Sequence, residues 1–481
     1  MPLPRLPLLM LSILAGCSGP VRVEPPPPPA PTLVTHAHPR ELRGLWIATV
    51  ANIDFPRTQG APADAQQEEL AELVDLASES GLNALFFQIR PEGDALYRSE
   101  LEPWSRYLTG TQGQDPGYDP LAELITLAHA RNIEVHAWFN PYRASLDRRR
   151  ANAAGHVATA HPDWVVSYGT HLWMDPGRPE VRAHTVAVVR DVVSRYDVDG
   201  VHFDDYFYPY PNGATFPDDA TFGAYRAQGG ELPREAWRES NVNALVRDVS
   251  AAVRETRAGV VFGISPFGIY RPGQPEGIRG MDQVASLHAD PLHWAREGWV
   301  DYLAPQLYWP TTQKAQAHEP LMRWWAEQTG GHCRLYVGNY LSQIGVTPAW
   351  TVEELAAQRA LAVEHPGVHG NIWFSARPLI EDREDVRAWM REQYATPALP
   401  PVRHDHDLPA PTVELDDGAL CMEHAAADSL RAYVVYDERG EVFAVAPVGS
   451  HEHVAVPAGT WAISAVDRGG AESPAVVQIV P

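Results

Sequence analysis

The chain has 481 residues, of which 45% are hydrophobic and 21% charged, proportions that are typical of a globular protein. Its 61 acidic residues outnumber its 38 lysines and arginines, which gives a formal net charge of -23 at pH 7. An electrostatic field of this sign repels polyanions, so the composition excludes nucleic acid and anionic lipid head groups as partners. The chain is too long for one domain with a single ordinary hydrophobic core. Its length suits a large barrel with a small second domain.

The first residues have the pattern of a secretion signal. Arg5 precedes an apolar run at 6–14, which is too short to span a bilayer as a mature helix. Small residues then lead to Cys17, in a pattern that resembles a bacterial lipoprotein signal whose cysteine becomes the lipidated N-terminus. We therefore expect a signal peptide at 1–17 and a lipid-anchored, extracytoplasmic protein, with a plain secretory peptide as the alternative. Ser18, in place of an aspartate, favours the periplasmic face of the outer membrane of a Gram-negative cell.

Two proline-rich segments divide the rest of the chain. Residues 18–40 contain an unbroken proline run from Pro25 to Pro29, which predicts a stiff polyproline II tether between the membrane and the folded body. Residues 399–411 are rich in proline and histidine and predict a linker. The segments leave two folded parts, 41–398 and 412–481.

The larger part, 41–398, alternates short apolar strands with helices about eight times. Apolar strands rich in β-branched and aromatic residues are typical of buried parallel sheets. Eight such units predict a closed (β/α)8 TIM-type barrel, and the lack of a glycine-rich phosphate loop disfavours an open doubly wound sheet. Helices are expected at 65–80, from Asp119-Pro120 onward and at 179–195. Strands are expected at 43–50, 83–90, 133–140, 200–204, 260–265, 302–308, 335–340 and 370–375.

The tail at 412–481 alternates strands with turns. Arg439-Gly440 and Gly469-Gly470 mark two of the turns. The pattern is similar to a fibronectin type III-like β-sandwich, whose expected role is docking or spacing. Its strands are expected at 432–436, 442–448, 453–456, 461–466 and 475–480.

The fourth predicted barrel strand ends in two aspartates. Side chains alternate along a strand, so Phe203 should pack under the helices while His202 and Asp204 point into the barrel. Asp205 follows where the strand ends, so both acids should reach the barrel mouth, where such folds hold their active sites. Asp204 and Asp205 are therefore the candidate catalytic residues, with helix caps or surface charges as the alternative.

Other polar and aromatic residues should surround these acids at the mouth. Aromatic faces stack on the C–H surface of sugars and polar groups bind their hydroxyls, so the set predicts a sugar site. His202 and the tryptophans could instead fill the barrel, and Arg90 could be an ion-pair partner of Glu92. We expect no metal or cofactor, because no ligand partner at metal spacing accompanies His202. The candidate substrate-binding residues are Arg90, Glu92, Trp138, Asn140, Tyr142, Arg143, Asp175, His202, Tyr206, Tyr208, Ser265, Gln306, Tyr308 and Trp373.

Six motifs together resemble the bacterial glycosyl-hydrolase-like family 10. The resemblance covers the whole predicted barrel but not the tail. It implies a TIM-type barrel, a place in the cell envelope, and activity on peptidoglycan glycan strands, notably strands stripped of stem peptides. The run 236–241 departs from the family pattern, which puts contacts from that loop in doubt. The motifs are Arg43-Gly44-Leu45-Trp46 with Asn52-Ile53-Asp54, and the runs 87–91, 135–143, 199–209, 263–268 and 304–309.

Two mechanisms stay open for a glycosidase of this kind. The seventh strand ends in Gly338-Asn339-Tyr340 without a carboxylate, which disfavours a retaining pair of glutamates. In the favoured scheme Asp204 polarises a 2-acetamido group of the substrate, which attacks the anomeric carbon, while Asp205 is the general acid and then the base. In the other scheme Glu92 or Asp175 pairs with Asp204. The rival functions are a non-catalytic glycan-binding lipoprotein and a metal-dependent polysaccharide deacetylase.

Overall fold

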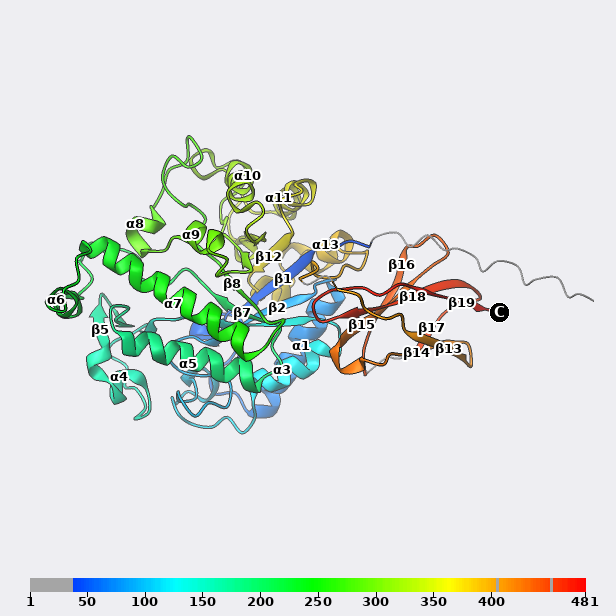
Figure 1. Ribbon diagram of the computed structural model, residues 1–481, viewed down its shortest axis with the longest axis horizontal. Coiled ribbons are helices and arrows are strands. Elements are labelled where there is room, and N and C mark those ends of the chain that lie inside the picture. The colour runs from blue at the N-terminus through cyan, green and yellow to red at the C-terminus, as the bar shows by residue number, and fades with distance from the viewer. Residues whose placement is uncertain (1–37, 404–405, 450–452) are drawn as a thin grey trace, which may run out of the picture.

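The computed structural model describes residues 38–403, 406–449 and 453–481 (Figure 1). The predicted signal peptide at 1–17, with Cys17, and most of the predicted tether therefore lie outside the described residues. Within the described ranges, no helix combines the length and the apolar character needed to cross a bilayer.

Parallel strands form a barrel in the larger part of the chain. Strands β10 and β11 stand at the two ends of the sheet, pairing with β9 and β12, and only Tyr336 separates them in the chain. They are two pieces of the seventh strand, so the sheet closes on itself with eight strand positions, and the predicted TIM-type barrel is confirmed over the open sheet. The strands, in the order of the sheet, are β10 (Arg334–Leu335), β9 (Tyr302–Leu303), β8 (Val261–Ile264), β7 (Gly200–Phe203), β3 (Glu134–Phe139), β2 (Ala84–Arg90), β1 (Leu42–Ile47), β12 (Gly370–Phe374) and β11 (Val337–Asn339).

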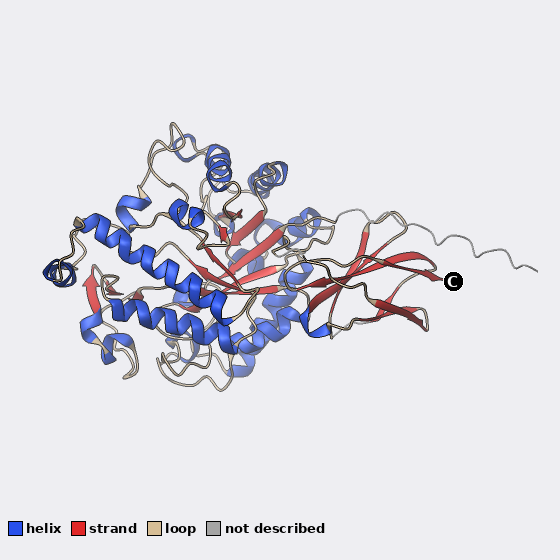
Figure 2. Ribbon diagram, in the orientation of Figure 1, coloured by secondary structure: helices blue, strands red, loops and turns tan. Residues whose placement is uncertain are grey.

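Helices surround the strands (Figure 2). Asp119 caps α3 as predicted, because its side chain accepts a hydrogen bond from the backbone amide of Ala122 at 3.1 Å. The expected helices at 65–80 and 179–195 correspond to α1 and α5. The helices are α1 (Ala63–Glu79), α2 (Arg106–Thr109), α3 (Pro120–His129), α4 (Val157–Ala160), α5 (Pro179–Arg195), α6 (Asp219–Ala227), α7 (Arg234–Thr256), α8 (Gln283–Leu287), α9 (Pro291–Arg296), α10 (His318–Thr329), α11 (Val352–Glu364), α12 (Arg377–Glu381) and α13 (Val386–Gln393).

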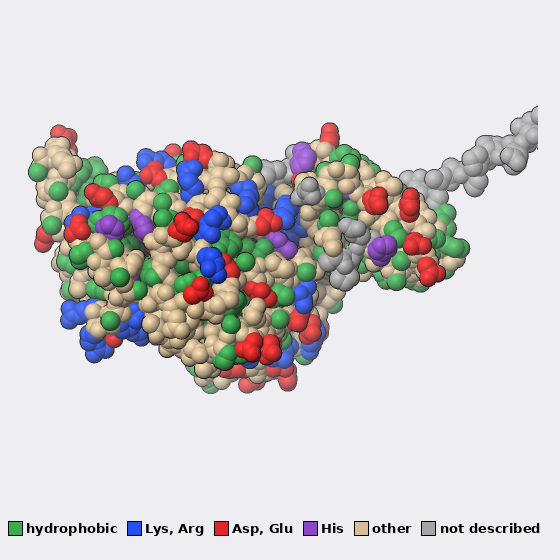
Figure 3. Space-filling model, turned by 90° about the horizontal axis from the view of Figure 1, so that it is seen from below, with side chains coloured by type: hydrophobic (Ala, Val, Ile, Leu, Met, Phe, Trp, Pro, Cys, Tyr) green, Lys and Arg blue, Asp and Glu red, His purple; other side chains and the backbone are tan. Residues whose placement is uncertain are grey.

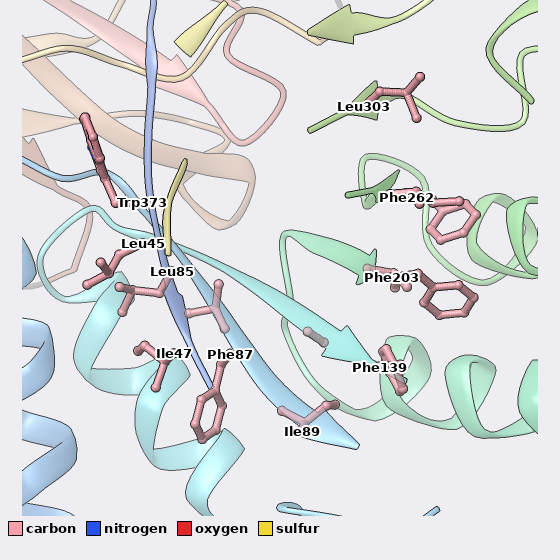
Figure 4. Close-up of a cluster of buried hydrophobic side chains, with 14 of the residues drawn as sticks. Leu45, Ile47, Leu85, Phe87, Ile89, Phe139, Phe203, Phe262, Leu303 and Trp373 are labelled. Carbon is pink, nitrogen blue, oxygen red and sulfur yellow. The ribbon is translucent and has the colours of Figure 1, made fainter. Parts of the chain in front are cut away.

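Alternation along the strands creates two separate cores. One lies between the strands and the helices, where Leu45, Phe203 and Trp373 belong to the same apolar cluster (Figure 4). The other fills the barrel interior and includes Trp46 and Tyr302. The period of two in each strand decides which side chains can reach the mouth.

A small antiparallel sheet follows β3 and has no counterpart among the predicted strands. It consists of β4 (Arg143–Ser145), β6 (His171–Met174) and β5 (Val165–Tyr168) in that order. Figure 1 shows β5 with α4 and α6 at the end of the barrel that is far from the C-terminal domain.

The tail is an all-β domain of two antiparallel sheets. The first two strands, β13 and β14, were not among the predicted ones, and the other five agree with prediction within a few residues. The fibronectin type III-like assignment stays a prediction. One sheet has the order β13 (Thr412–Asp416), β14 (Ala419–Glu423), β17 (His453–Ala455), and the other β16 (Val442–Pro447), β15 (Leu430–Tyr436), β18 (Gly459–Asp467), β19 (Val476–Val480).

Charged contacts join this domain to the amino-terminal end of the barrel. Arg403 and Arg431 both contact the buried Glu134 at the start of β3. Arg468 lies 2.6 Å from Asp197. Side chains of both signs lie along this junction (Figure 3). The described residues at the start of the predicted linker, 399–403, are therefore packed between the two parts.

Candidate active site

A pocket of about 300 Å³ opens at the carboxyl ends of the barrel strands. Asp204 and Asp205, directly after β7, both line it, as the strand alternation predicts. Within the described ranges they are the only carboxylates on its wall. The lining residues are Trp46, Ala48, Val50, Ile53, Gln88, Trp138, Arg143, Asp204, Asp205, Tyr206, Ser265, Gln306, Tyr308, Tyr340 and Phe374.

Asp204 is held by donors on several sides. The indole Nε1 of Trp138 and the backbone amide of Tyr206 each donate to its carboxylate at 3.2 Å, and the side-chain amide of Asn140 donates a third hydrogen bond. Burial raises the pKa of Asp204, while nearby Arg143 and these donors act against that rise. The donors all favour the ionised form, so Asp204 is the acid of the pair that is prepared to carry a negative charge.

Asp205 has fewer donors and the charge of Asp204 beside it. The phenol of Tyr210 donates a hydrogen bond to Asp205. Burial and then repulsion from Asp204 raise the pKa of Asp205 to about 7, against the hydrogen bonds from Tyr210 and Gln306. The surroundings thus separate the roles of the two neighbours: one carboxylate and one acid that holds its proton up to neutral pH.

Asn140 ties Asp204 to the adjacent strands. Its side-chain oxygen accepts hydrogen bonds from Gln88 at 2.6 Å and from Arg143 at 2.7 Å. Because the oxygen is occupied, the amide nitrogen must face Asp204. Asn140 is buried behind the pocket wall, where the guanidinium of Arg90 also donates to its backbone oxygen at 2.7 Å.

Aromatic rings make up much of the remaining wall. Tyr308 stacks on Tyr340 with ring centroids 4.6 Å apart and on Phe374 at 5.7 Å. The Arg143 guanidinium lies over the ring of Tyr206 at 5.1 Å. Gln306 donates a hydrogen bond to the backbone oxygen of Ser265 at 3.1 Å. This bond joins the segments that follow β9 and β8. A wall of aromatic faces with few polar groups suits a sugar ring.

Six of the predicted substrate-binding residues lie on the pocket wall, and a seventh contacts Asp204 from behind it. The six are Trp138, Arg143, Tyr206, Ser265, Gln306 and Tyr308, and the seventh is Asn140. Their roles toward a substrate stay predictions.

Arg90 and Glu92 lie away from the pocket. A register shift between Gln88 and Arg90 takes Arg90 out of the alternation that carried Gln88 into the barrel. Arg90 forms a fully buried ion pair, with Glu102 and not with Glu92. Glu92 accepts hydrogen bonds from the phenol of Tyr107 at 2.9 Å and from a backbone amide.

Asp175, Tyr142 and Tyr208 are also buried outside the pocket. Asp175 accepts from the hydroxyl of Thr221 at 2.7 Å and from the amide of Gly177 at 2.9 Å. Tyr142 and Tyr208 belong to the outer apolar core. They follow the strands, where the period of two no longer applies, so sequence alternation could not place them.

The predictions that Trp373 and His202 contact the substrate are both wrong. Trp373 points to the helices, where its indole donates to the Tyr394 hydroxyl at 3.1 Å, and its neighbour Phe374 faces the pocket instead. The predicted alternation of the eighth barrel strand, β12, was therefore out of phase by one residue, which exchanged its inward and outward side chains. His202 does point into the barrel, but it lies beneath the pocket and is fully buried.

Four residues at or beside the pocket had no predicted site role, namely Trp46, Ile53, Tyr210 and Phe374. Trp46 and Ile53 belong to the recognised motifs of the first strand and its loop, which was the available signal. Tyr210 lies in an irregular segment, so only the tertiary structure shows its contact with Asp205. Within the described ranges, no three His, Cys, Asp or Glu side chains are grouped as metal ligands.

The raised pKa of Asp205 predicts a cost in stability that depends on pH. The ordinary pKa is 3.8 and the folded value about 7, so folding favours the protonated acid, and stability falls as pH rises through that interval. Asp205→Asn removes this loss, so from pH 5 to pH 8 the variant should gain about 2 to 3 kcal/mol relative to wild type. Urea unfolding of both proteins at the two pH values measures it. An equal difference at both pH values would contradict the buried, protonated acid.

The chain is similar to known glycosyl hydrolases. A family model described as Glycosyl hydrolase-like 10 matches residues 41–352. The chain is 40% identical over 378 residues to the glycosyl hydrolase YngK of Bacillus subtilis (strain 168), covering 75% of this chain and 73% of YngK. It is 36% identical over 383 residues to the glycosyl hydrolase DigH of Escherichia coli (strain K12), covering 73% of this chain and 87% of DigH. Among solved structures, the PgaB (BpsB) glycoside hydrolase domain from Bordetella bronchiseptica is similar at a TM-score of 0.48 and 14% identity, over 73% of this chain and 98% of that chain. The family resemblance predicted from the motifs is confirmed.

Proposed function

Because this chain belongs to the glycosyl hydrolase-like 10 family, we propose that it is a glycosidase that cleaves the N-acetylated glycan strands of the bacterial cell wall. The observation that carries the proposal is the pair Asp204 and Asp205 on the pocket wall. Asp204 accepts hydrogen bonds from several donors, and Asp205 has a pKa raised to about 7.

The favoured mechanism is substrate-assisted. Asp205 donates its proton to the glycosidic oxygen as the bond to the anomeric carbon breaks, and the oxygen of the 2-acetamido group attacks that carbon. The Asp204 carboxylate accepts a hydrogen bond from the N–H of the acetamido group. This stabilises the positive charge that forms on the acetamido group. The Asp205 carboxylate then takes a proton from water as water attacks the same carbon, which regenerates the acetamido group with retention of configuration.

The position of the other acids supports this scheme over a conventional carboxylate pair. Glu92 and Asp175 were the candidates for a second carboxylate, and both are buried with their own hydrogen-bond partners outside the pocket. A substrate that supplies its own nucleophile needs only the two acids that line the pocket.

The pocket wall also suits an N-acetylated sugar. Trp46, Ala48 and Phe374 line the pocket together with Trp138, whose indole contacts Asp204. These apolar surfaces can bury a methyl group close to the carboxylate that would bind the acetamido N–H. The choice of cell-wall glycan, and of peptide-free strands within it, rests on the family resemblance.

The location follows from the predicted lipoprotein signal. We place the protein on the periplasmic face of the outer membrane, attached through lipidated Cys17, with the proline-rich tether between membrane and barrel. Incorporation of labelled palmitate into the wild type but not into Cys17→Ser tests the anchor, and equal labelling of both would remove it.

Digestion of purified, peptide-free glycan strands tests the activity. We expect soluble fragments with new reducing ends, identified by mass spectrometry, and little release from strands that keep their stem peptides. Binding of the strands without fragments would favour the rival function, a glycan-binding lipoprotein. Release of acetate without glycosidic cleavage, abolished by a chelator, would favour a deacetylase.

A further inference from the structure

A series of hydrogen bonds runs along the barrel interior, below the pocket. The indole Nε1 of Trp46 lies 3.1 Å from Nε2 of His202, whose Nδ1 lies 3.0 Å from the Tyr302 hydroxyl. The same hydroxyl lies 3.1 Å from Nδ1 of His136, and Nε2 of His136 lies 3.2 Å from Glu134. All five side chains are at least nine-tenths buried.

The donors in this series have one consistent direction. The Trp46 indole can only donate, so Nε2 of His202 accepts and its Nδ1–H donates to the Tyr302 oxygen. The Tyr302 hydroxyl then donates to Nδ1 of His136, and Nε2–H of His136 donates to the Glu134 carboxylate. Burial lowers the pKa of His202, with a further contribution from His136, so the neutral form that this direction requires is favoured. Reversal at one link would leave two donors or two acceptors facing each other.

The two ends of the series have different functions. Trp46 lines the pocket beside Trp138, which donates to Asp204. Glu134, at the other end, contacts Arg403 from the packed segment after the barrel and Arg431 from β15. Arg431 is further anchored by Asn132, whose side-chain oxygen it reaches at 2.6 Å. The C-terminal domain therefore supplies a charge that holds the lower end of the series in place.

We propose that Arg431 and Arg403 are positioning residues of the pocket, acting through Glu134, His136, Tyr302 and His202 to fix the Trp46 indole in the pocket floor. The C-terminal domain is then a working part of the active site and not only a spacer or docking module. The kinetic measurements that test this proposal rest on the proposed function, whereas the measurement of the Trp46 indole resonance does not.

The Glu134 carboxylate is suited to its position at the end of the series. Arg403 and Arg431 lower the pKa of Glu134 to about 2 against the effect of burial. It therefore stays an acceptor for His136 across the physiological pH range. With His202 neutral, the series has its charged groups, Glu134 with Arg403 and Arg431, at the end of the barrel opposite Asp204 and Asp205.

Tyr302→Phe interrupts the series at its centre and removes a single oxygen atom. The matched control is Tyr336→Phe, which makes the same change in a neighbouring ring, 5.1 Å away between centroids, whose hydroxyl is outside the series. Arg431→Met tests the far end, and Arg431→Lys retains its charge. The readouts are the ¹H–¹⁵N resonance of the Trp46 indole, assigned with Trp46→Phe, and kcat and KM on peptide-free glycan.

We expect Tyr302→Phe and Arg431→Met to shift the Trp46 indole resonance and to lower kcat about tenfold with little change in KM. Tyr336→Phe should leave the resonance and kcat near those of wild type, and Arg431→Lys should restore most of both. An unmoved indole resonance in folded Arg431→Met would overturn the proposal, whether or not the protein cleaves glycan. A resonance shift without any glycan cleavage in wild type would keep the series and reject the proposed function.

Discussion

Asp205→Asn should lower kcat on peptide-free glycan by about 10²- to 10⁴-fold, with KM nearly unchanged, because asparagine cannot donate a proton to the leaving oxygen. In wild type the pKa of Asp205 is raised to about 7 by burial and then by Asp204, so the acid is protonated below that pH. The rate of wild type should therefore fall as pH rises above about 7. The residual rate of the variant should lack this decline. Initial rates of reducing-end formation across pH 5 to 9 measure both effects.

Asp175→Asn is the matched control for this loss of activity. Asp175 is also a buried aspartate with a pKa raised chiefly by burial, but it contacts Thr221 and Gly177 outside the pocket. The control should keep kcat within about threefold of wild type, since it removes no group that would touch the glycan. If Asp175→Asn loses as much activity as Asp205→Asn, and both stay folded, the conventional pair of carboxylates replaces substrate assistance.

Asp204→Asn should lower kcat by about 10²- to 10³-fold, because a neutral amide cannot stabilise the charge on the acetamido group. It should also change the pH profile in a direction that a purely structural defect would not. Repulsion from Asp204 is one of the two causes that raise the pKa of Asp205, so its loss should lower that pKa and move the alkaline decline in rate to lower pH. A decline that stays near pH 7 would show that the two carboxyl groups do not interact as the site indicates.

De-N-acetylated strands separate the two mechanisms further. Wild type should cleave them far more slowly than acetylated strands, and Asp204→Asn should have little further effect on the small remaining rate. Equal cleavage of both substrates by wild type would require a nucleophile or base from the protein.

The aspartates themselves were predictable from sequence because they follow directly after a strand. Val201 and Phe203 on one face and His202 and Asp204 on the other establish the alternation, and Asp205 is the second residue after the strand ends at Phe203. The same rule failed at Trp373, where the eighth strand was assigned one residue out of phase. It also failed at Arg90, where a register shift interrupts the alternation. A single sequence records neither event, because both depend on how neighbouring strands pair.

The amino-acid sequence by itself determined the closed barrel, the all-β tail, the family and the position of Asp204 and Asp205 at the barrel mouth. These features depend on periodicity and on motifs within short segments. The tertiary structure alone decided that Glu92 and Asp175 lie outside the pocket, that Tyr210 contacts Asp205, and that Arg403 and Arg431 reach Glu134. Those contacts join residues from loops, strands and different domains. Their geometry is set by the packing of the whole chain, which no local pattern of residues encodes.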